Sequence, residues 1–142
     1  MKNIILFIVV ITTFKIKSQE VIHWLIHKDS ITDCNFIKNA KFVNEEQDGK
    51  ITEGYTIMFK NDTVTETINN GKYFIKSKMK FVSKCSYEIY VLETNLPSAT
   101  YLIGKTIYSE ILETAQTDNL IKIRTKAAQW IELVFKKIES YD

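Results

Sequence analysis

The chain has 142 residues, a length that corresponds to one domain able to bury its own core. Its 19 Lys and Arg face 17 Asp and Glu, so the formal net charge is only +2, which argues against the basic surface of a nucleic-acid-binding protein. With 1 Pro and 4 Gly, the composition is also not that of a disordered or low-complexity chain.

The first predicted element is an apolar leader. Lys2 supplies a positive start, residues 4–14 (IILFIVVITTF) carry no charge, and the small residue Ser18 follows. This order is typical of a secretory signal peptide, and the apolar run is shorter than the roughly 20 residues that span a bilayer. We therefore predict a signal peptide over residues 1–18 and one exported domain, periplasmic or secreted, over residues 19–142. An uncleaved anchor is the alternative.

Removal of the leader changes the charge and leaves no predicted membrane span. Three of the 19 basic residues lie in it, so 16 basic residues would face 17 acidic ones, a net charge of −1. The basic character of the whole chain therefore belongs partly to the leader. Nucleic acid is not among the expected partners.

A lead-in with both histidines follows the leader. His23 and His27 are four residues apart, so a helix would place both imidazoles on one face, as in zinc-binding helices. Asp29, Asp33 or Cys34 could supply a further ligand, although Cys34 is expected to pair with Cys85. Position 24 is Trp, where the H-E-x-x-H motif has its catalytic Glu. A surface or packing role is the favoured interpretation, and no cofactor or metal is predicted. A metal-dependent enzyme is the less favoured alternative.

The two cysteines are Cys34 and Cys85. In an exported chain, a single pair of cysteines usually forms a disulfide, because the compartment is oxidising. This bond would close a loop of about fifty residues and stabilise the fold by about 3–4 kcal/mol. Two buried free thiols are the alternative.

After Cys34, the sequence alternates between apolar and polar residues, with polar turns between the segments. From Tyr73 to Phe81, within the segment 72–82, every second residue is apolar or small, and the intervening positions include three lysines. Such a period of two is typical of a half-buried strand, and Asn70-Gly71 is a strong hairpin signal. The expected strands are residues 41–44, 54–60, 63–69, 72–82, 86–93, 105–114, 120–125 and 129–138.

About eight sequential antiparallel strands favour an all-β fold. Closing such strands into an up-and-down barrel or curled sandwich removes exposed sheet edges. The segment Val21–Lys38 is expected to lie outside the strands, as a short N-terminal lead-in that could cap one end with a helix.

Three stretches also carry a resemblance. Residues 34–42 (CNFIKNAKF), 72–90 (KYFIKSKMKFVSKCSYEIY) and 102–105 (LIGK) resemble a group of small exported proteins of Bacteroidetes-type bacteria. The resemblance implies a lipocalin-like β-barrel and no catalytic residues. The chain departs from that pattern in about fifteen extra residues before Cys34 and in Phe81, where a Trp is expected.

The function predicted from these features is a non-enzymatic exported binding module for a small apolar ligand or a cell-envelope partner. No G-x-S-x-G element or phosphate-binding loop is present, and no oligomeric state is predicted. An eight-stranded barrel can either hold one small ligand or fill its interior with side chains, so a filled-core interaction protein is the alternative. The aromatic residues expected to face inward and line a ligand site are Tyr55, Phe59, Tyr73, Phe81, Tyr87 and Trp130.

Overall fold

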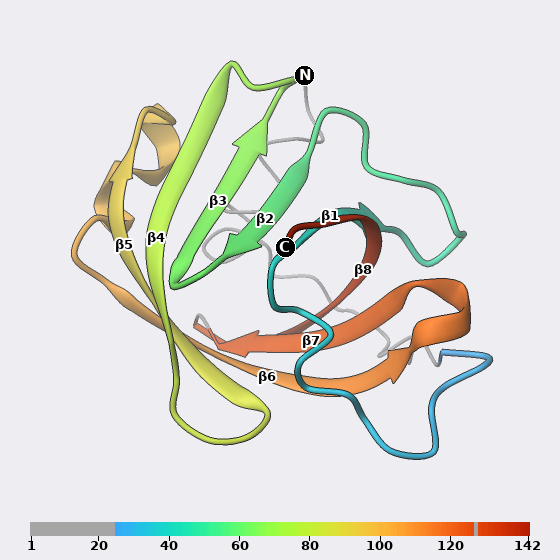
Figure 1. Cartoon of the computed structure of the whole chain (residues 1–142). Coiled ribbons are helices and arrows are strands. Elements are labelled where there is room, and N and C mark those ends of the chain that lie inside the picture. The colour runs from blue at the N-terminus through green and yellow to red at the C-terminus, as the bar shows by residue number, and fades with distance from the viewer. Residues whose placement is uncertain (1–24, 127) are drawn as a thin grey trace.

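The computed structural model describes residues 25–126 and 128–142, which fold into a closed eight-stranded barrel (Figure 1). Each strand pairs antiparallel with its neighbour in sequence, and β8 pairs with β1. The expected all-β fold is therefore confirmed. Its strands are β1 (Ala40–Glu45), β2 (Thr56–Lys60), β3 (Thr63–Ile68), β4 (Tyr73–Phe81), β5 (Ser86–Thr94), β6 (Thr106–Ala115), β7 (Leu120–Lys126) and β8 (Trp130–Ser140).

Two short 3₁₀ helices interrupt the strands. η1 (Pro97–Leu102) joins β5 to β6, and η2 (Gln116–Asp118) joins β6 to β7. The predicted hairpin at Asn70-Gly71 joins β3 to β4, and both residues have the positive φ that such a turn requires (54° and 84°). In the described part of the chain, no helix has the length and apolar character needed to cross a membrane.

The up-and-down topology gives the barrel two different ends. We call the end where β1 begins and β8 finishes the lead-in end; it also carries the β2–β3, β4–β5 and β6–β7 loops. The opposite, far end carries the remaining loops, including η1. The lead-in, residues 25–39, is coloured blue to cyan in Figure 1 and reaches β1 at the first of these ends.

The lead-in is more deeply buried than the sequence indicated. Its described part contains no helix, and Cys34, Phe36 and Ile37 belong to the barrel core, with Ile37 0% exposed. The described part of the segment thus lies outside the strands, as expected, but the suggested helix is absent from it and the burial of these three residues was not predicted. The reason is geometric: an open barrel end exposes apolar side chains, and the apolar residues within the last turn of the lead-in cover them.

The predicted disulfide between Cys34 and Cys85 is present. It joins the lead-in to the β4–β5 loop, across a sequence separation of 51 residues. Hydrogen bonds fix the same segment elsewhere: the Asp29 amide donates to the Thr114 carbonyl (2.7 Å), and the Asp33 amide donates to the Thr114 hydroxyl (2.9 Å). Covalent and polar contacts thus hold the lead-in to two places at the barrel end, the β4–β5 loop and the end of β6.

A row of aromatic rings fills the lead-in half of the interior. Phe36 contacts Phe42, Phe42 contacts Phe59, and Phe59 contacts Tyr87, all edge to face with ring centroids 5.9–6.3 Å apart. Phe81 packs against Tyr87 from the side, at 5.9 Å. Edge-to-face pairs at these separations are favourable beyond the area they bury. This half of the barrel is a filled core.

Candidate functional site

The far half of the barrel interior contains a partly enclosed cavity of about 70 Å³. Tyr87, the last ring of the aromatic row, borders it, and so does Leu102 from η1. Most of its wall is aliphatic or aromatic. The lining residues are Tyr55, Ile57, Glu66, Ile75, Ser77, Tyr87, Ile89, Val91, Leu102, Ile107, Ser109, Ile123, Thr125, Leu133 and Phe135.

One carboxylate, that of Glu66, faces this apolar cavity. On β3, the residues Val64, Glu66 and Ile68 share the inward face, because side chains alternate along a strand. The Tyr55 hydroxyl donates a hydrogen bond to Glu66 Oε2 at 2.9 Å. Glu66 is only half-buried because it borders the cavity. Desolvation raises the pKa of its carboxyl, although the bond from Tyr55 opposes this shift.

The two cavity tyrosines remain protonated over the whole range of ordinary pH. Tyr55 and Tyr87 are 3% and 2% exposed, and burial is the main reason why the pKa of each phenol is raised. The nearby Glu66 charge raises both values further. Both phenols therefore act as neutral hydrogen-bonding groups beside the carboxylate.

Three hydroxyls complete the polar part of the wall. Ser77 lies on β4, Ser109 on β6 and Thr125 on β7, each at an inward position that an apolar residue would usually fill. The Ser109 and Thr125 hydroxyls lie 2.8 Å apart and hydrogen-bond to each other. The cavity therefore combines an apolar wall with a few placed polar groups, as small-molecule sites generally do.

The aromatic candidates from the sequence divide between the two halves. Tyr55 and Tyr87 line the cavity. Phe59 and Phe81 instead belong to the aromatic row. Tyr73 lies at the start of β4, at the far end, and packs against the core while partly exposed.

The expectation that Trp130 faces inward is wrong. It is 41% exposed, and its ring contacts Tyr108 (5.9 Å between centroids) and the Arg124 guanidinium (4.6 Å) on the outer surface. The reason is the period of two along β8, which turns Leu133 and Phe135 inward and therefore Trp130 outward.

Glu66 is not among the site residues predicted above, although the sequence contains a signal for it. In residues 63–69 (TVTETIN), Val64 and Ile68 mark one apolar face, and Glu66 is the charged residue that interrupts this face. Ser77, Ser109 and Thr125 interrupt the inward faces of their strands in the same way. A charged residue on the apolar face of a strand indicates either an error in the strand assignment or a functional group.

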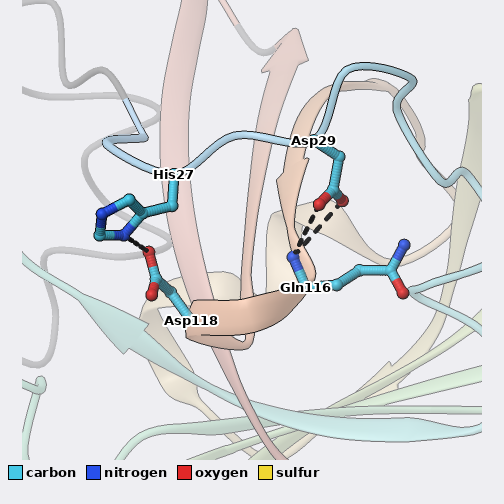
Figure 2. A network of polar contacts seen from close by, with 4 residues as sticks. All are labelled: His27, Asp29, Gln116 and Asp118. Carbon is cyan, nitrogen blue, oxygen red and sulfur yellow. Dashed lines mark hydrogen bonds and ion pairs between the residues drawn. The ribbon is translucent and has the colours of Figure 1, made fainter.

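The histidine pair is not assembled into a metal site in the described residues. His23 lies outside them, and Cys34 is bonded to Cys85. His27 Nδ1 lies 3.0 Å from Asp118 Oδ2. Figure 2 shows this pair and the Asp29 carboxylate, which accepts a hydrogen bond from the backbone amide of Gln116. No group of three His, Cys, Asp or Glu placed to hold a metal occurs between residues 25 and 142, leaving aside residue 127. These contacts attach the lead-in to η2.

The raised pKa of Glu66 gives a prediction for stability. Because its pKa is higher in the folded than in the unfolded chain, the folded state binds more protons between the two values, and stability falls as pH rises through that interval. We therefore expect Glu66→Gln to be more stable than wild type at pH 7 and equal to it below the unfolded pKa of about 4.5. Urea unfolding at both pH values measures this. Glu93→Gln, on the outer surface, should show no such difference, and equal effects of the two variants would contradict the prediction.

Comparisons of the chain with protein family models, with curated proteins and with solved structures found no match. The candidate site is therefore defined by the geometry of this chain alone.

Proposed function

We propose that this protein is a non-enzymatic, exported binding module that holds a small, largely apolar molecule inside the far half of its barrel. The observation that carries this proposal is the division of the interior. Aromatic rings fill one half, whereas the other half keeps a cavity of about 70 Å³ with an inward carboxylate. A protein that needed only a stable core would gain by filling this space, because cavities and carboxylates in apolar surroundings both reduce stability.

The disulfide supports the proposed export. Disulfides persist in oxidising compartments and are rare in the cytosol, and Cys34–Cys85 joins two segments of the fold. The apolar leader over residues 1–18, which lies outside the described residues, would direct the chain there.

Enlarging Val91 should abolish binding. Val91 is 1% exposed and faces the cavity, so Val91→Phe places a ring in the space that a ligand would use. In NMR spectra, xenon should shift the cavity isoleucine methyl resonances of wild type and leave those of Val91→Phe unchanged. Leu92→Phe is the matched control, because Leu92 is the next residue on β5 and lies on the outer surface, 39% exposed.

Two results would argue against this function. One is wild-type protein whose cavity isoleucine methyl groups fail to respond to xenon in NMR spectra. The other is a response to xenon that is as large in Val91→Phe as in wild type. Small apolar cavities in proteins do take up xenon, so the NMR measurement tests the cavity independently of the natural ligand.

A further inference from the structure

The cavity wall contains a negative group and no positive one. Glu66 is the carboxylate, and no Lys, Arg or His of the described residues lines the space around it. Within the described chain, the carboxylate accepts one hydrogen bond, from Tyr55 to Oε2, and none reaches Oε1. A carboxylate in an apolar cavity is costly unless a cation or several donors compensate it. The fold itself thus compensates the charge only in part.

The groups around Glu66 match the chemistry of an ammonium ion. Tyr55 and Phe135 present stacked rings with centroids 6.5 Å apart, and Tyr87 lies on the floor of the same cavity. Aromatic faces attract ammonium groups, and the Ser77 hydroxyl can accept a further hydrogen bond. A carboxylate together with aromatic faces thus favours a cationic head over a neutral or an anionic one.

The remaining residues of the wall suit the apolar end of such a ligand. Ile57, Ile75, Val91 and Ile123 present only aliphatic groups, which suit an alkyl chain. The volume limits that chain: a cavity of 150 Å³ accommodates benzene, and this one has about 70 Å³. About three or four non-hydrogen atoms therefore fit without movement of the wall.

We propose that the cavity binds small primary alkylamines, with the ammonium group on the Glu66 carboxylate and the alkyl chain against the isoleucines. This inference rests on the proposed function, because it assigns a ligand class to the same cavity. A ligand of four non-hydrogen atoms is expected to bind with a Kd no lower than about 10⁻⁵ M, given the affinity that each atom can contribute.

A matched pair of probes tests the charge. Propylamine and 1-propanol have the same size, but only propylamine is cationic at pH 7. Chemical shifts of the cavity isoleucine methyl groups should give a Kd at least about tenfold lower for propylamine, since hydrogen bonds to charged groups are the stronger ones. Glu66→Gln should weaken propylamine binding by at least about tenfold and leave 1-propanol binding within about twofold. Glu93→Gln should change neither value.

A second measurement uses only wild-type protein. A bound ammonium ion stabilises the carboxylate, so saturating propylamine should lower the Glu66 pKa, as followed by the carboxyl ¹³C shift. Propylamine affinity should fall as pH is lowered through that pKa. Tyr55 and Tyr87, the other titratable groups that line the cavity in the described residues, stay protonated throughout.

The outcomes separate the two proposals. If neither probe perturbs the cavity methyl groups of wild type, the proposed function fails, and the ligand class fails with it. If 1-propanol binds as tightly as propylamine, or Glu66→Gln keeps the wild-type affinity for propylamine, the amine assignment is overturned while the binding function stands. An unchanged Glu66 pKa under saturating propylamine would overturn it as well.

Discussion

Replacing both Cys34 and Cys85 with alanine should lower the free energy of unfolding by about 4 kcal/mol. The bond closes a loop with a sequence separation of 51 residues, and in the chain-entropy model a loop of this length restricts the unfolded chain by that amount. Because a single domain of this size is usually stable by only about 5–15 kcal/mol, the loss is a large part of the total. Urea unfolding of the variant and of wild type at the same pH measures it.

The same experiment contains its own controls. Wild type under reducing conditions should lose a similar free energy without any substitution. Cys34→Ala alone should cost nearly as much as the double variant, because either change removes the whole bond. The urea m-value should rise, since the unfolded chain without the crosslink exposes more surface. A loss below about 1 kcal/mol in the double variant would contradict the proposed role of the bond in fixing the lead-in.

The barrel could be predicted from the sequence because its signal is local. Alternation over residues 72–82 identifies β4 without reference to any other segment, and Asn70-Gly71 identifies the turn before it. Sequential hairpins then leave two free edges, which pair as β1 and β8. The disulfide could be predicted as well, because an exported chain with two cysteines has a single possible pairing.

The burial of the lead-in could not be predicted because it depends on contacts distant in sequence. Phe36 and Ile37 belong to no alternating segment, so the sequence gives no strand face on which to place them. Their burial results from the open end of a barrel that is formed by residues 40–140. A local pattern cannot show that an irregular segment crosses such an opening.

The cavity was only partly predictable, for the same reason. The alternation places Glu66 on an inward face, but the neighbours of its carboxylate depend on how β2 and β3 pair and on the curvature of the closed sheet. Ile57 lies opposite Glu66 in that pairing, and Tyr55 reaches the carboxylate from just before β2. Whether side chains fill the space beside them depends on the summed volumes of eight strands.

Phe42→Ala should lower the free energy of unfolding by about 3–5 kcal/mol, the usual cost of truncating a buried phenylalanine. Phe42 is 0% exposed and lies in the middle of the aromatic row, between Phe36 and Phe59. Tyr90→Ala, on the outer face of β5 and 46% exposed, should cost no more than about 1 kcal/mol. Thermal or urea unfolding compares the two. A loss in Phe42→Ala no larger than in Tyr90→Ala would show that the row is not a tightly packed core.

The division of the interior into two halves also predicts how Phe42→Ala affects ligand binding. If the lead-in half supplies stability and the far half supplies binding, then folded Phe42→Ala should still bind propylamine, whereas Val91→Phe should not bind it. Tyr87 is the residue through which the two halves could be coupled, because it ends the aromatic row and lines the cavity. Loss of propylamine binding in folded Phe42→Ala would mean that the row positions Tyr87 for the ligand. The two halves would then form one functional unit.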